Sequence, residues 1–190
     1  MNTRETIIQS SIPILARQGY AGTSMRKVAR HFNREPSIIY AHFTDKESLL
    51  RETRRYINQK LDSDIQVSNT QSAPMMLRQT IRFQFENREL IMALLQYFMA
   101  CRQDFDHVQT GGYVPESAYQ HLHAIIQQGV AEGVYASNDV QKDAKAASHL
   151  INGYLIEYFD HEMTDLELDT VVSQITDFIE RSLQCEVVPA

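Results

Sequence analysis

The sequence predicts an all-α protein of two domains, and three observations support this fold class. Apolar residues recur three and four positions apart through most of the 190 residues, which is the period of an amphipathic helix. Glycine and proline are sparse, with seven and five residues, and no stretch alternates apolar and polar side chains between turn signals as strands would. The polar, turn-rich segment 62–74 interrupts the pattern, so we predict one domain over residues 1–61 and a larger helical one over 62–190.

Residues 23–47 contain two short helical patterns separated by a tight turn. Thr23 and Ser24 are residue types that cap helix N-termini, and apolar residues follow them on one helical face. Asn33 comes next, and asparagine tolerates the left-handed backbone conformation that a sharp turn between helices needs. Pro36 suits the first turn of a helix, so a second short helix is expected to begin beside it. Two helices joined in this way form a helix-turn-helix, which presents its second helix to the major groove of DNA.

A third helix is predicted to start at Thr44 and to continue through Leu61. The segment from Thr44 to Glu47 matches a capping box, in which the Thr44 hydroxyl accepts a hydrogen bond from one backbone amide and the Glu47 carboxylate reaches back to another. Because this helix joins the two predicted domains, we expect it to transmit changes between them.

The rest of the chain is predicted to be helical over residues 74–88, 88–105, 116–132, 140–161 and 165–184. The last two segments carry broad apolar stripes, and the short acidic link between them makes them antiparallel neighbours. Periodicity alone leaves two alternatives open, because such stripes pack either within one subunit or against a second copy of the chain.

The charge is divided unevenly along the chain. Residues 1–60 hold 11 Lys and Arg against 5 Asp and Glu, a balance of +6, whereas residues 61–190 hold the other 7 against 19, a balance of −12. A basic surface can follow a phosphate backbone, and an acidic one is repelled from it. The alternative is that the cations only solvate a helical surface. Their coincidence with the helix-turn-helix favours DNA as the partner.

Several other classes of protein are excluded by the sequence. Cys101 and Cys185 match no metal or redox spacing, and we predict no metal and no cofactor. Catalysis would need more than Asp104 and His107 one turn apart, since neither a second such pair nor a catalytic motif occurs, so we predict no catalytic residue and no enzyme. No apolar run approaches 18 residues and no signal pattern opens the chain, so we expect a cytoplasmic protein without a membrane partner.

The first 60 residues also carry a series of short motifs in fixed order and without gaps: Gly19-Tyr20, Thr23-Ser24, Val28-Ala29, Ile39-Tyr40, His42-Phe43 and Lys46-Glu47-Ser48-Leu49. In these positions the sequence resembles the TetR family of bacterial transcriptional regulators. It departs from the family at Asn33, where glycine is usual, at Arg34 and Glu35, and at Ile38, where many members have threonine. These changes lie in or beside the turn and the recognition helix, so we expect the chain to read an operator sequence of its own.

Two sources assign the residues that contact DNA. Position on the recognition helix directs Glu35, Pro36, Ser37 and Ala41 toward bases, and Arg26 can pair with guanine. The resemblance implies phosphate contacts for Tyr40, His42 and Lys46 and for the caps Thr23 and Ser24. The structural alternatives are that Tyr40 partly packs against the first helix and that His42 is an ordinary surface residue. Arg34 has the alternative of a solvated turn residue, and Glu35 that of a charge that mainly complements the helix dipole. The predicted set is Thr23, Ser24, Arg26, Lys27, Glu35, Pro36, Ser37, Tyr40, Ala41, His42 and Lys46.

The resemblance also implies a small-molecule pocket and a homodimer in the larger domain. Each pocket candidate has a core alternative, because methionine and aromatic residues at helical spacing usually fill a core. The pocket candidates are Met92, Leu95, Phe98, Met99, Phe105, His107, Tyr113, Tyr119, His123, Asn152 and Tyr158. In the family the last two helices of each subunit pair in a four-helix bundle, which implies an interface at Leu150, Tyr154, Val171, Ile175, Phe178 and Ile179.

The function implied is that of a repressor that a small-molecule effector releases from a near-palindromic double-stranded DNA operator. Effector binding must then weaken DNA binding, and DNA must weaken effector binding by the same factor. The alternative is a DNA-binding regulator or architectural protein without a small-molecule effector.

Overall fold

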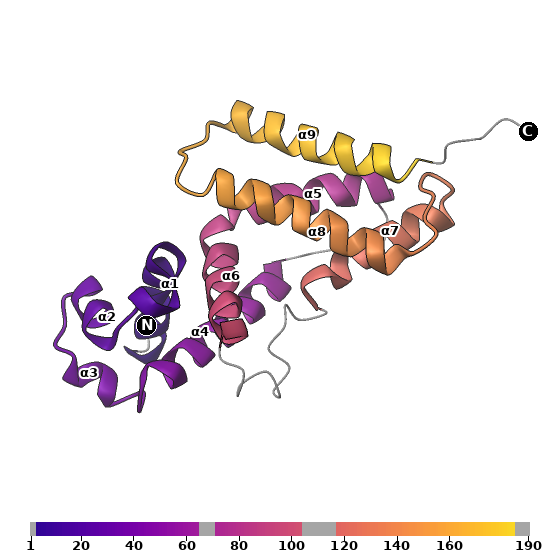
Figure 1. Ribbon diagram of the computed structural model, residues 1–190. Helices are drawn as coiled ribbons and strands as arrows, with labels where there is room; N and C mark the ends of the chain where they lie inside the picture. The colour runs from indigo at the N-terminus through magenta and orange to yellow at the C-terminus, as the bar shows by residue number, and fades with distance from the viewer. Residues whose placement is uncertain (1–2, 65–70, 104–116, 185–190) are drawn as a thin grey trace, which may run out of the picture. The chain divides into compact units, whose positions relative to one another are not determined.

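The computed structural model describes residues 3–64, 71–103 and 117–184, and these residues form nine helices and no strand, as the sequence predicts (Figure 1). By contacts the chain divides into two compact units. The first contains α1 (Thr3–Gly22), α2 (Met25–His31), α3 (Ser37–Tyr40), α4 (Lys46–Asp64) and α6 (Arg88–Gln103). The second contains α5 (Ala73–Glu86), α7 (Ser117–Ala131), α8 (Val140–Glu157) and α9 (Asp165–Ser182).

The division differs from the simple order of the sequence, because α6 packs along α1 and against α4 rather than with the helices on either side of it in the chain. The predicted functional domains, residues 1–61 and 62–190, stay a prediction, because the two units are defined by contacts and not by function. No helix among the described residues is long and apolar enough to cross a membrane.

One hydrophobic cluster of the first unit is made by apolar side chains from α1, α2, α3 and the start of α4. Phe32, Ile38 and Tyr56 pack against it and are partly buried. Because α3 has only four residues, it depends on this packing rather than on its own hydrogen bonds for its position. The fully or nearly buried members are Ile7, Ile8, Ile14, Met25, Val28, Ala29, Ile39, Phe43 and Leu49.

The start of α4 corrects one prediction. The helix begins at Lys46, and the Asp45 carboxylate accepts a hydrogen bond from the Ser48 backbone amide at 2.7 Å. The Ser48 hydroxyl oxygen in turn accepts from the Asp45 amide at 3.2 Å. The reciprocal pair is therefore one residue later than the predicted Thr44–Glu47 box, which is wrong. The Ser48 amide also holds the pKa of Asp45 below its usual value.

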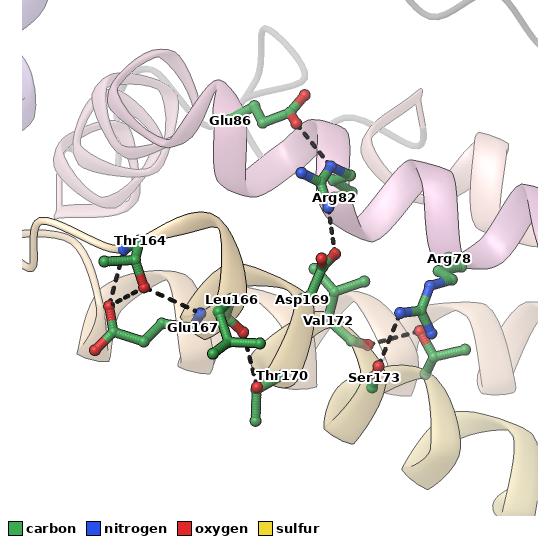
Figure 2. Close-up of polar contacts among 11 residues, drawn as sticks. Arg78, Arg82, Glu86, Thr164, Leu166, Glu167, Asp169, Thr170, Val172 and Ser173 are labelled. Atoms are coloured by element: carbon green, nitrogen blue, oxygen red, sulfur yellow. Dashed lines mark hydrogen bonds and ion pairs between the residues drawn. The ribbon is translucent and has the colours of Figure 1, made fainter.

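Polar contacts tie α9 to α5 in the second unit (Figure 2). Arg82 on α5 binds Glu86 one turn along the same helix at 2.9 Å and also pairs with Asp169 on α9. Arg78 donates to the Ser173 hydroxyl at 2.9 Å. α9 itself starts at a capping box between Thr164 and Glu167, and this box fixes where the helix begins.

The end of α9 is held by the turn that follows α7. The Tyr135 hydroxyl donates to the Glu180 carboxylate at 3.2 Å, and the Ala136 amide donates to the Leu183 carbonyl at 2.6 Å. The Tyr135 ring lies directly over Gly129, where an added Cβ would fall 2.0 Å from the ring. Only glycine allows this approach, so Gly129 is needed for the packing of the buried tyrosine.

Two further features of the second unit concern helix ends. The Glu132 carboxylate at the end of α7 accepts a hydrogen bond from the Ala73 amide at the start of α5 at 3.0 Å. α8 ends at Glu157, although the sequence predicts helix to residue 161. The apolar pattern continues through Tyr158, but the backbone leaves the helix there, with φ −96° and ψ 11°. The link 158–164 then lets α9 run back in the opposite direction to α8, as predicted (Figure 1).

Candidate DNA-binding interface

The turn between α2 and α3 has the geometry of a helix-turn-helix. Asn33 adopts the predicted left-handed conformation with φ 56°, the only non-glycine residue with positive φ among the described residues. The Arg34 amide then donates to the Ala29 carbonyl at 2.9 Å, which closes the end of α2. Val28, Ala29 and Ile39 are fully buried. Their burial fixes the inner faces of both helices and leaves the opposite faces to solvent.

The outer face carries most of the predicted DNA contacts. On and around α3, Tyr40 is 58 % exposed, so more than half of its surface is open to solvent. Pro36 is half-buried, as expected of the residue that starts the helix. Ser24 is also half-buried and caps α2 by accepting from the Lys27 amide at 3.3 Å. The exposed predicted contacts are Arg26, Lys27, Glu35, Ser37, Tyr40, Ala41 and His42.

Three further cationic or titratable side chains lie on this exposed surface and are absent from the predicted set. They are Arg30 and His31 in the last turn of α2 and Arg34 in the turn after it. The signal that finds them is the helical period, because the buried side of α2 already accounts for Met25, Val28 and Ala29. They extend the basic face of α2 toward the turn.

Thr23 does not fit the role predicted for it. Its side chain is 2 % exposed, and its hydroxyl donates to the Gly19 carbonyl at 2.8 Å. The threonine therefore closes the end of α1, and Ser24 alone caps α2. A buried hydroxyl with a partner inside the protein is not available to a phosphate.

Lys27 and Lys46 reach the same turn of the chain, the C-terminal turn of α1. The Lys27 ammonium donates to the Gln18 side-chain oxygen at 2.6 Å and to the Gly22 carbonyl at 2.7 Å. The Lys46 ammonium donates to the Tyr20 carbonyl at 2.7 Å and lies 4.1 Å from the centre of the Tyr20 ring. Partial burial lowers the pKa of Lys46 from its usual value.

Comparison with family models decides what this region is. Residues 7–53, from α1 into α4, match the model of the bacterial regulatory proteins of the tetR family. Over these residues the chain is therefore similar to the DNA-binding region of the TetR family. The resemblance inferred from the sequence motifs is thereby confirmed.

Solved structures share the fold over nearly the whole chain. A TetR-family regulator from Agrobacterium tumefaciens is 15 % identical, with a TM-score of 0.77 and coverage of 96 % of this chain and 98 % of that one. A protein of Saccharomonospora viridis solved in complex with choline is 22 % identical, with a TM-score of 0.75 and coverage of 95 % and 96 %. A ketosteroid transcriptional regulator of Mycobacterium tuberculosis is 15 % identical, with a TM-score of 0.70 and coverage of 97 % and 96 %. Comparison with curated protein sequences gives no match.

The effector candidates suggested by the TetR resemblance are divided between the two units. Met92, Leu95, Phe98 and Met99 lie on α6, where Met92 and Phe98 are buried and Met99 is 47 % exposed. Tyr119 and His123 on α7, and Asn152 and Tyr158 on and after α8, are half-buried in the second unit. Phe105, His107 and Tyr113 lie outside the described residues.

A depression of about 330 Å³ lies between α1 and α4 in the first unit, and it includes none of these candidates. Arg4 crosses it to the Glu52 carboxylate at 2.8 Å, and Arg55 reaches the same carboxylate at 2.6 Å. The depression is lined by Arg4, Glu5, Ile8, Glu52, Arg55, Tyr56 and Gln59.

The predicted TetR-type dimer residues fall into two groups. Val171, Ile175 and Ile179 are at most 4 % exposed, because this side of α9 packs inside the second unit, where α9 lies against α5. Their side chains do not fit a contact with a second copy, which corrects the prediction for these three. Phe178 is 58 % exposed on the other side of α9, and Leu150 and Tyr154 on α8 are half-buried.

Proposed function

We propose that this chain is a transcriptional repressor that binds a near-palindromic DNA operator as a homodimer and leaves it when a small molecule binds. The observation that carries the proposal is the exposed face of α3 beside the exposed cations of α2. Arginine pairs with guanine in the major groove, a glutamate accepts from cytosine, and a small apolar side chain contacts the thymine methyl group. Arg26, Glu35 and Ala41 are exposed residues of the helix-turn-helix and supply these three chemistries.

Homodimerisation is supported by an apolar surface on α8 and α9. Phe178 and Ile156 are 58 % and 57 % exposed, and Leu166 at the start of α9 is 77 % exposed. The Tyr154 and Tyr158 rings stack with their centres 6.4 Å apart. A dimer also suits the operator, because two recognition helices must enter successive major grooves about 34–36 Å apart.

A small-molecule effector is supported by the fold alone. A structure of the same fold from Saccharomonospora viridis holds choline. By linkage, an effector that weakens DNA binding by a given factor must itself be bound more weakly, by the same factor, when DNA is present. The identity of the effector is left to screening.

The test is selection of DNA bound by the full chain from a random pool. We expect enrichment of two inverted half-sites whose centres lie about 10 base pairs apart. Ala41→Glu adds a negative charge at the exposed C-cap of α3 and is expected to abolish enrichment. Gln59→Glu adds the same charge on an exposed position of α4 and serves as the matched control.

Enrichment of a single unpaired half-site would contradict the dimer, and equal enrichment by Ala41→Glu and the unchanged protein would contradict the role of α3. Thermal-shift screening of metabolites against the same protein then separates a repressor with an effector from a DNA-binding regulator without one, since a ligand that binds only the folded state raises the melting temperature.

A further inference from the structure

The C-terminal turn of α1 differs from an ordinary helix end. The helix is interrupted at Gly19, where φ is 69° and ψ is −179°, and the chain then turns through Tyr20 to Gly22. At a positive φ the Cβ of any other residue comes too close to the backbone. Glycine has no Cβ and therefore adopts such values readily. The last four carbonyl groups of a helix have no partner within it, so those of Tyr20 and Gly22 at the end of α1 can accept from side chains of other helices.

Oxygen atoms of residues 18–22 accept hydrogen bonds from two ammonium groups of other helices. Lys27 of α2 donates to the Gly22 carbonyl and to the Gln18 side chain, and Lys46 of α4 donates to the Tyr20 carbonyl while resting on the Tyr20 ring. A helix C-terminus is the negative end of the helix dipole and favours cations. Both lysines are therefore held on one short segment, residues 18–22, which we call the lysine-holding turn.

Each lysine keeps at least one N–H donor that these hydrogen bonds do not use. An ammonium group has three N–H donors. The two recorded bonds of Lys27 leave one donor, and the single recorded bond of Lys46 leaves two. A phosphate oxygen can thus join each ammonium without displacing its protein partners. Lysine is a flexible point charge, so a fixed position reduces the conformational freedom that it loses on binding a phosphate.

We propose that Gln18 and Tyr20 in the lysine-holding turn are positioning residues, which hold Lys27 and Lys46 in place for the DNA backbone before DNA arrives. This inference deepens the proposed function and rests on it. Neither Gln18 nor Tyr20 touches DNA in this scheme, and each acts through its lysine.

One contact extends this turn toward α6. A Cβ added at Gly19 would lie 3.0 Å from the side-chain oxygen of Gln96 on α6. The left-handed residue that shapes the lysine-holding turn therefore packs against α6, which is also the helix that carries four of the effector candidates.

The test is a double-mutant cycle on DNA affinity with the full chain and its selected operator. Tyr20→Leu removes the ring under Lys46 but keeps the backbone carbonyl, and we expect the dissociation constant to rise about two- to fivefold, the effect of one exposed cation–π contact. Tyr20→Phe keeps the ring and is the matched control, with an affinity close to that of the unchanged protein. Tyr20→Met provides a second ring-free variant should the leucine variant fold poorly.

The salt dependence separates positioning from contact. Lys46→Ala should reduce the slope of log affinity against log salt by about 0.9, because one phosphate contact is lost. Tyr20→Leu should weaken binding with the slope unchanged, and should have no further effect in the Lys46→Ala protein. Gln18→Leu with Lys27→Ala forms the second cycle, and the same pattern is expected there.

The outcomes are distinct. If the unchanged protein selects no DNA, the proposed function fails and this inference fails with it. If DNA is bound but the effects of Tyr20→Leu and Lys46→Ala on affinity multiply independently, the ring has only a structural role and the inference alone is overturned. An unaltered dissociation constant in folded Tyr20→Leu overturns it as well.

Discussion

Tyr40 on α3 and Phe178 on α9 are equally exposed, each at 58 %, yet they lie in segments of opposite formal charge. Tyr40 comes two residues before exposed His42, within residues 1–60, whose formal balance is +6. Phe178 follows Asp177, within residues 61–190, whose balance is −12. The formal charge of each region fits the partner that we propose for its exposed ring, which is DNA for Tyr40 and a second copy of the chain for Phe178.

The same substitution at both positions tests this difference. Phe178→Asp places a carboxylate in the proposed dimer surface, and we expect the dimer dissociation constant to rise about 100-fold or more, the effect of losing a central aromatic contact. Tyr40→Asp should leave the dimer intact but weaken DNA binding by a similar factor, because it adds a negative charge where phosphates approach. Analytical ultracentrifugation and DNA titration measure the two effects.

Two results would remove the distinction. A dimer that survives Phe178→Asp would show that this side of α9 is not an interface. A monomeric Tyr40→Asp protein would show that α3, rather than α9, carries the association.

A smaller effect is expected from Gly129→Ala, which changes the support of α9 without changing its surface. The new methyl group would lie 2.0 Å from the Tyr135 ring, so the ring must move. Alanine is favoured over glycine within a helix by about 1 kcal/mol, but displacing a buried tyrosine and overpacking its site cost more. We expect a net loss of about 1–3 kcal/mol in the free energy of unfolding.

Hydrogen exchange on the full chain shows where that loss falls. Protection of amides in α9 should decrease while amides in α2 and α4 keep theirs, because Tyr135 and Glu180 lie in the second unit. Equal loss of protection in both units would contradict a local role for this contact. Val130→Ala, an exposed change next to Gly129, is the matched control.

The smallest effect is expected for the pH dependence of stability that Glu132 contributes in the second unit. Hydrogen bonds from Gln128 and then from the Ala73 amide lower the pKa of Glu132 below 4.5. A carboxyl group whose pKa is lower in the folded state stabilises the protein above pH 4.5, and this contribution is lost as the pH falls from 4.5 through the folded-state value. Glu132→Gln should thus be slightly less stable than the unchanged protein at pH 6 and should lose less stability between pH 6 and pH 4.

Urea unfolding at the two pH values measures this difference, with Glu89→Gln on α6 as an exposed control. An identical loss of stability on acidification in Glu132→Gln and in the unchanged protein would show that the carboxylate adds nothing beyond its hydrogen bond.

The sequence predicts local backbone structure, such as turns and helix starts, better than it predicts contacts between distant segments. The left-handed turn at Asn33 follows from the tolerance of asparagine for that conformation, and the helix-turn-helix follows from the two short apolar patterns around it. The box at the start of α4 is misplaced by one residue because Thr44 and Asp45 are both good capping types and only the backbone decides between them.

Contacts between distant segments account for the other differences. Periodicity identifies the apolar stripe of α9 but not its partner, so Ile175 and Phe178 receive the same role although one is buried and the other exposed. The acceptors of Lys27 and Lys46 likewise could not be predicted. Tyr20 lies 26 residues before Lys46, so no local pattern indicates that its carbonyl accepts from that lysine.

The placement of α6 also bears on how the chain is made. The first unit combines α1–α4 with a helix that ends at Gln103, and α5 of the second unit is synthesised in between. On the ribosome the helix-turn-helix would thus emerge long before the helix that packs along α1, and the unit reaches its full set of contacts only after α6 has left the exit tunnel. A fragment cut at the apparent end of the DNA-binding region would leave the α6-facing side of α1 in water.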